Sequence, residues 1–148
     1  MSELLITESL KTKGFIIVPI KGTSMNPLFY EKRDKVYIEK YDGNYALKKG
    51  DVVLYQRESC EYVLHRLIKT VNGAYVFCGD NHYILEYGVQ DSQILGVCTG
   101  YFKYDKYIDF KKSLKYKIYK NTYAKSFFIR KLYNKIKRIF TKNKVYIG

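Results

Sequence analysis

The chain is poor in the residues that build metal sites and disulfide frameworks. Its 148 residues include no tryptophan, two prolines, two histidines and three cysteines, and no CxxC pair is present. So few histidines beside an odd number of cysteines fall short of a structural zinc site. Cys60, Cys78 and Cys98 are therefore predicted to be small, buried hydrophobic residues in a reduced compartment. We expect neither a metal nor a cofactor.

Long hydrophobic runs are also absent. No stretch reaches the roughly 18 uncharged apolar residues of a transmembrane helix. The N-terminal segment MSELLITESL is acidic and has neither the basic start nor the small-residue cleavage site of a secretory signal peptide. We therefore expect the protein to stay on the cytoplasmic side of the membrane.

The excess of positive charge belongs to one end of the chain. Residues 1–100 hold 12 basic and 12 acidic side chains, whereas residues 101–148 hold 15 basic and 2 acidic ones, which accounts for the net charge of +13. With 47% hydrophobic and 17% aromatic residues, the chain has enough apolar side chains for a core, which excludes wholesale disorder. The composition predicts one domain over 1–109 and a basic tail over 110–148.

The first region has the pattern of a mainly β fold. Residues 1–13 predict a short helix that ends at Gly14. Segments rich in Val, Ile, Tyr and Phe follow at 15–20, 35–41, 51–57, 61–71, 74–79 and 93–104. Asn72-Gly73 between two of them is a typical tight-hairpin sequence. We predict a curled antiparallel β-sheet or partly open barrel.

The tail has the pattern of two basic amphipathic helices. Asp109 and Thr122 are predicted as their N-terminal caps. In the second helix Phe128, Leu132, Ile136 and Ile139 recur at three- and four-residue spacing. The basic side chains fall mostly on the other flank: Arg130, Lys131, Lys135, Lys137, Arg138 and Lys142.

Three hypotheses account for this tail. Residues 110–142 are expected to lie on an anionic membrane surface, with the apolar face at the headgroup boundary. Alternatively, the helices pack on the β domain, for which Tyr116, Ile118 and Tyr119 are suited. A third hypothesis is a nucleic-acid-binding module, since Lys and Arg mixed with Tyr and Phe suit phosphate contact and base stacking. The neutral body and the separation of charges from aromatics argue against nucleic acid as the first choice.

Three polar positions have the chemistry of a hydrolytic site. Ser24 lies between Gly22 and Pro27, in a turn that exposes its hydroxyl, although most such serines only satisfy backbone groups. His65 stands within the apolar run YVLHRLI, where a lone histidine is more often a hydrogen-bonded core residue. Asp80 lies in a Gly-Asp-Asn turn, whose ordinary role is structural. None of the three is decisive alone.

Four short motifs occur in order between about residues 15 and 100. They are Ser24-Met25-Asn26-Pro27, Gly50-Asp51-Val52-Val53, His65-Arg66 and Gly79-Asp80-Asn81. This arrangement resembles the signal peptidase I superfamily of serine peptidases, whose wider clan includes the self-cleaving SOS-repressor domains. A histidine before the arginine is similar to the archaeal and endoplasmic-reticulum-like branch, whereas the usual bacterial branch has a lysine there.

The resemblance implies a role for each residue and a fold of signal peptidase type. Ser24 would be the nucleophile, His65 the general base and Asp80 the acid that orients His65. A neutral histidine, with an unperturbed pKa of about 6.5, accepts a serine proton at neutral pH. Glu86 is an alternative third acid. Met25 and Pro27 would line a shallow cleft that binds substrate as an added strand.

The chain departs from this family in two respects. Gly22 has no hydroxyl where relatives often carry a serine that helps to bind the oxyanion, and the transmembrane anchor of typical relatives is missing. The resemblance still predicts a serine endopeptidase of signal-peptidase type that cleaves a leader or signal segment of a peptide or protein precursor. Its peripheral membrane association would replace the anchor. A catalytically inactive scaffold with the same fold is the remaining alternative.

Overall fold

The computed structural model describes residues 3–144, and side chains from Leu5 to Thr141. Residues 1–2 and 145–148, the outer ends of the two predicted regions, lie outside the described residues. The helices are α1 (Glu3–Lys13), α2 (Leu114–Asn121) and α3 (Phe127–Lys144), with a short 3₁₀ turn η1 (Asp91–Gln93). The strands are β1 (Phe15–Pro19), β2 (Asp34–Lys40), β3 (Val52–Gln56), β4 (Tyr62–Val71), β5 (Ala74–Cys78), β6 (Glu86–Val89), β7 (Ile94–Lys103) and β8 (Lys106–Asp109). In this part of the chain, every helix is too short or too polar to span a membrane.

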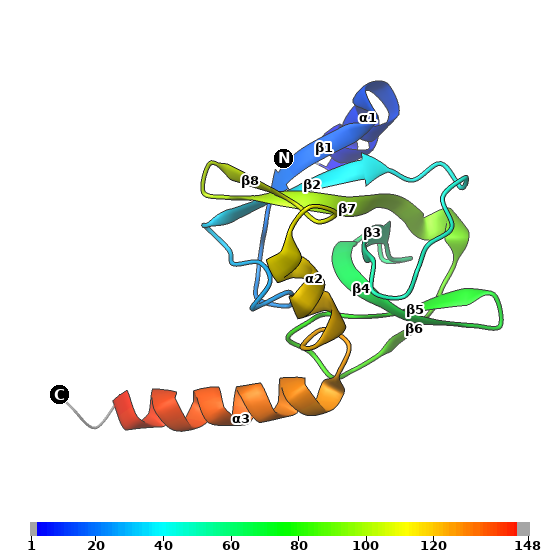
Figure 1. The fold of residues 1–148 in the computed structure, drawn as a ribbon. Coiled ribbons are helices and arrows are strands. Elements are labelled where there is room, and N and C mark those ends of the chain that lie inside the picture. The colour runs from blue at the N-terminus through cyan, green and yellow to red at the C-terminus, as the bar shows by residue number, and fades with distance from the viewer. Residues whose placement is uncertain (1–2, 145–148) are drawn as a thin grey trace.

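The eight strands form one antiparallel sheet that curls without closing (Figure 1). Its order is β1-β2-β7-β3-β4-β5-β6, and β8 pairs with one end of β7. The predicted mainly β architecture is confirmed, as is the hairpin at Asn72-Gly73, where both residues have positive φ. The short strands β6 and β8 were not among the predicted segments.

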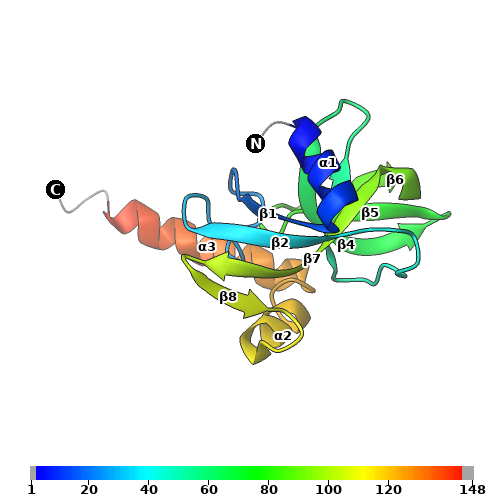
Figure 2. The same ribbon diagram turned by 90° about the horizontal axis from the view of Figure 1, so that it is seen from above.

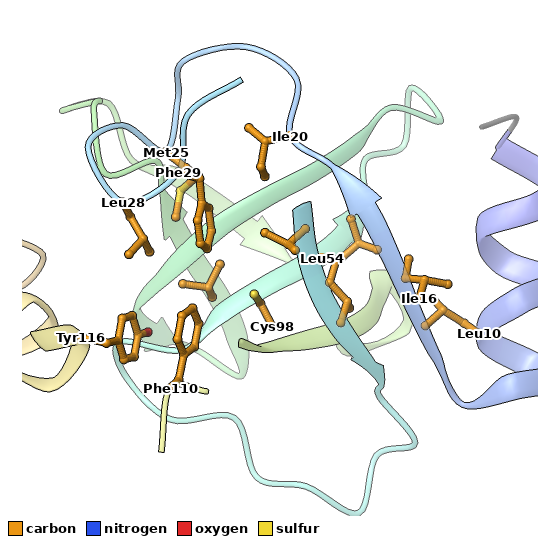
Figure 3. Close-up of a cluster of buried hydrophobic side chains, with 13 residues drawn as sticks. Leu10, Ile16, Ile20, Met25, Leu28, Phe29, Leu54, Cys98, Phe110 and Tyr116 are labelled. Atoms are coloured by element: carbon orange, nitrogen blue, oxygen red, sulfur yellow. The ribbon is translucent and has the colours of Figure 1, made fainter. Parts of the chain in front are cut away.

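The core lies on both faces of the sheet, because β3 is buried on both sides. Val52 and Leu54 pack into one hydrophobic cluster, whereas Val53 and Tyr55 pack into the other. Alternate residues of a strand point to opposite faces, so one short strand serves both clusters. The first cluster, drawn in Figure 3, reaches from Leu10 of α1 to Tyr116 of α2. This cluster therefore joins both α1 and α2 to the sheet.

The tail contains the two predicted helices, but their caps differ from the prediction. Ser113 caps α2, since its hydroxyl accepts the Tyr116 N–H at 3.1 Å. Asp109 belongs to β8. Thr122 ends α2, because its N–H and hydroxyl both donate to the Ile118 carbonyl. Residues 122–125 then form a turn between α2 and α3.

The two tail helices have different relations to the sheet. Tyr116 is buried and Tyr119 half-buried against the body, whereas Ile118 is exposed. Packing on the β domain is thus confirmed for two of the three residues suited to it. Helix α3 projects beyond the sheet in both views (Figures 1 and 2). Its first turns contact the body, notably through Arg130, which is fully buried and not on the exposed basic flank.

Candidate active site

A cleft of ≈ 630 Å³ opens between the end of β1 and the first half of β4. One wall contains Val18–Lys21 and the other Tyr62–His65, and both Ser24 and His65 line it. β1 is the outermost strand on its side of the sheet. The ladder between β4 and β5 begins only at Arg66, so the preceding residues of β4 pair with β3 alone. The cleft is therefore bounded by the outer edge of β1 and by the part of β4 that precedes its pairing with β5.

The loop that carries Ser24 is anchored in the core. Met25 and Phe29 are buried side by side in the first cluster (Figure 3). The Phe29 N–H donates to the Met25 carbonyl at 3.1 Å. Ser24 itself is half-buried at the cleft. Met25 both packs in the core and lines the cleft, whereas Pro27 is half-buried and not among the lining residues. Of the two predicted substrate-binding residues, the structure thus brings one to the cleft.

The turn at residues 79–81 docks against the Ser24 loop. The Asn81 N–H donates to the Ser24 carbonyl at 2.9 Å, and its side-chain amide donates to the Thr23 carbonyl at 3.1 Å. A Cβ atom placed on Gly79 would lie 2.6 Å from the Ser24 backbone carbonyl oxygen and 3.2 Å from His65 Nε2. Only glycine fits so close to the neighbouring backbone. The turn therefore contacts both the Ser24 backbone and the His65 ring.

His65 lies in β4 opposite Val53 and is 8% exposed. Burial, and secondly the charge of nearby His82, lower its pKa to about 4. The ring is consequently neutral at physiological pH and able to accept a proton. His82 Nδ1 would also lie 3.2 Å from a Cβ on Gly79, so a second imidazole faces the same point. Sequence analysis assigned no role to His82.

A tyrosine and a glutamate approach the other side of the His65 ring. The Tyr55 hydroxyl lies 3.4 Å from His65 Nδ1 and donates a 2.6 Å hydrogen bond to Glu86. Arg57 in turn donates to both Glu86 oxygens, at 2.7 and 2.8 Å. These Arg57 hydrogen bonds lower the pKa of Glu86 and keep it ionised. Glu86 therefore reaches His65 through Tyr55.

Asp80 has different partners. Arg66 binds both of its oxygens, at 2.7 and 2.6 Å, and the Tyr119 hydroxyl donates at 2.8 Å. Arg130 from α3 adds a contact at 3.5 Å. Among the described residues, these three are its side-chain hydrogen-bond partners, and His65 is not one of them. The predicted nucleophile and base thus share the cleft, while the predicted orienting acid is fully buried in an ion network beside it.

The thiols and potential metal ligands are placed as follows. Cys78 and Cys98 are buried as predicted, whereas Cys60 is exposed. Within residues 3–144, His, Cys, Asp and Glu side chains form no group of three or more suited to a metal ion.

No protein-family model matches the sequence, and no curated protein matches it significantly.

Proposed function

We propose that this chain is a serine endopeptidase, similar in type to the signal peptidases, with Ser24 as nucleophile and His65 as general base. It would cleave an extended leader or signal segment of a peptide or protein precursor. The observation that carries the proposal is the cleft that Ser24 and His65 share, where the turn at residues 79–81 contacts both the Ser24 loop and the His65 ring. The resemblance of the four ordered motifs supports the same residues.

The cleft has the form that an extended peptide requires. Its two walls are strand edges, and a peptide laid between them pairs its backbone with β1, with β4 or with both. Ile38, Leu54 and Met25 give it an apolar lining for alternate side chains. Its volume falls within the usual range of ligand sites. Such a strand would occupy the gap that the curled sheet leaves open.

The chemistry needs a proton acceptor for the serine and donors for the oxyanion. Neutral His65 takes the Ser24 proton as Oγ attacks the scissile carbonyl, and later gives it to the leaving amine. In the described part of the chain, the N–H groups of Ser24 and Met25 donate to no acceptor. We assign them to the developing oxyanion, in place of the hydroxyl that Gly22 lacks.

The test is a cleavage assay on a complex library of peptides from a digested proteome, read by mass spectrometry. Wild-type protein is expected to produce new peptide termini that Ser24→Ala does not produce. The two proteins should unfold at the same denaturant concentration. A fluorophosphonate probe should label Ser24 in the wild type. Identical products from wild type and Ser24→Ala would refute the proposal. Absence of cleavage and labelling in a folded wild type would favour the inactive scaffold.

We further infer that α3, and not the whole of 110–142, holds the enzyme at an anionic membrane surface. Its apolar arc is exposed, with Phe128 at 75%, Leu132 at 47% and Phe140 at 69%. Arg130 and Asn134 face the body instead: Arg130 binds the Gly79 and Ala124 carbonyls, and Asn134 donates to the Tyr83 hydroxyl. The arc thus points away from the sheet, and each basic residue beside it adds about 1 kcal/mol near an anionic leaflet.

The membrane proposal is tested with vesicles on the full chain. Phosphatidylserine-containing vesicles should pellet the wild type, and high salt should release it. Leu132→Glu should abolish pelleting. Thr141→Glu makes the same charge change away from the apolar arc and should retain most of it. Equal loss in both variants, or preference of the wild type for RNA over these vesicles, would contradict membrane docking by the apolar arc.

A further inference from the structure

The two ring nitrogens of His65 have different surroundings. Nε2 faces Gly79 at the cleft, on the side of the Ser24 loop. Nδ1 faces the Tyr55 hydroxyl at 3.4 Å, inside the second hydrophobic cluster. Tyr55 is fully buried and stacks on Phe77, with ring centroids 4.6 Å apart. The hydroxyl is therefore held in place by packing and not by a flexible side chain.

The hydrogen bonds of Tyr55 determine which nitrogen carries the proton. Tyrosine has one hydroxyl hydrogen, and an ionised carboxylate only accepts. The hydroxyl donates this hydrogen in the 2.6 Å hydrogen bond to the Glu86 oxygen. Burial, reinforced by Glu86, raises the pKa of Tyr55, so the hydroxyl keeps its proton. The Tyr55 oxygen is then left as an acceptor for His65, which requires a hydrogen on Nδ1.

We propose that Tyr55, backed by Glu86 and Arg57, is the positioning residue that fixes His65 as its Nδ1–H tautomer and leaves the Nε2 lone pair directed at the Ser24 side. The structural part stands by itself, and its catalytic consequence rests on the proposed function. In that reaction the Ser24 proton moves to Nε2. The imidazolium then donates from Nδ1 to Tyr55, whose dipole is aligned by the negative charge of Glu86.

This assignment explains why Asp80 is not needed for orientation. Arg66 and Tyr119 already bind its two oxygens in the buried network, with Arg130 as a further partner. Glu86 instead lines a smaller hollow beside His65 and His82, where Arg57 provides its countercharge. Because the Tyr55 hydroxyl lies between Glu86 and His65, the charge of the carboxylate acts on the ring from a greater distance. We therefore expect a weaker contribution than that of an acid bound directly to the ring.

The first test observes His65 directly, without a substrate. The chain has two histidines, so ¹⁵N spectra of the imidazoles contain two sets of signals, which His82→Asn assigns. At neutral pH, wild-type His65 should show a protonated Nδ1 and an unprotonated Nε2. Tyr55→Phe keeps the stacked ring and should move the Nδ1 signal toward the unprotonated range as the other tautomer becomes populated. Tyr116→Phe, which removes a buried hydroxyl bound to Arg66, should leave His65 unchanged.

The second test measures the consequence at Ser24. Tyr55→Phe should lower the rate of Ser24 labelling by a fluorophosphonate, and kcat for a cleaved library peptide, by roughly 10- to 100-fold, with little change in KM. Glu86→Gln should produce a smaller loss, and Tyr116→Phe none. A Tyr55→Phe protein with wild-type imidazole signals, or a wild-type His65 protonated on Nε2, overturns the proposal. Failure of the peptidase assignment leaves the tautomer result intact, so the two failures are distinguishable.

Discussion

Two consecutive residues of β4, His65 and Arg66, point to opposite sides of the sheet and enter different environments. His65 lines the cleft and contacts Tyr55, whose hydroxyl separates it from Glu86. Arg66 meets Asp80 in a fully buried network that includes Arg130 of α3. Adjacent residues of a strand thus divide between a reactive side and a structural side. The difference teaches that an acid assigned to a histidine from a sequence motif need not be its partner in space.

The first prediction concerns the reactive side and has the largest expected effect. His65→Ala should lower the cleavage rate by about 10²- to 10⁴-fold, because it removes the general base. The rate is measured on a peptide identified in the library assay. Unfolding by urea should be cooperative as in the wild type, since the ring forms few hydrogen bonds. A variant with wild-type activity would exclude His65 as the base.

The second prediction concerns the structural side. Asp80→Asn should destabilise the fold by about 3–5 kcal/mol, because two buried guanidinium groups lose their shared countercharge. Urea unfolding of the full chain measures this. Glu86→Gln is the matched control, since Glu86 is about a quarter exposed at its side chain and Arg57 still reaches solvent. A larger loss for Glu86→Gln than for Asp80→Asn would reverse the proposed division between the two sides.

The third prediction is the pH dependence that His65 imposes. Its folded pKa of about 4 lies below the unfolded value of about 6.5, so the unfolded chain binds its proton first as the pH falls. The contribution of neutral His65 to the free energy of unfolding is fully present above pH 6.5. It is lost as the pH falls toward 4, by up to about 3 kcal/mol. The unfolding free energy should fall less between pH 7 and pH 4 in His65→Gln than in the wild type.

The same pKa sets the activity profile. His82, Glu86, Arg57 and Asp80 are the charged or titratable groups that act on His65. The acidic limb of the kcat/KM profile should lie near pH 4 and not near the unperturbed histidine pKa of about 6.5. By pH 6, kcat/KM should no longer rise with pH. A limb centred near pH 6.5 would show that the base is more solvated than a ring that is 8% exposed.

The fourth prediction has the smallest effect. Tyr119→Phe removes one hydroxyl from Asp80 while both guanidinium contacts remain. Loss of this hydrogen bond should cost about 1–2 kcal/mol in urea unfolding and leave the library cleavage pattern unchanged. A loss of activity with unchanged stability would place Tyr119 on the reactive side and weaken the comparison.

The candidate site was partly predictable because some of its signals are local. Ser24 and Met25 in a Gly- and Pro-bounded turn, and a histidine within an apolar strand, are visible in the sequence. Tyr55 was missed, since its meeting with His65 depends on the register between β3 and β4, in which Val53 faces His65. Arg130 was assigned to an exposed flank because helical periodicity does not reveal which turn docks on the body.

The sequence by itself determined the β region, the hairpin at residues 72–73 and the two helices of the tail, because alternation, turn residues and helical spacing act over a few neighbours. Only the tertiary structure decided that Glu86 approaches His65 through Tyr55 while Asp80 joins Arg66 and Arg130. These partners come from strands and helices distant in the chain, and only the curl of the sheet and the docking of the tail bring them within hydrogen-bonding distance.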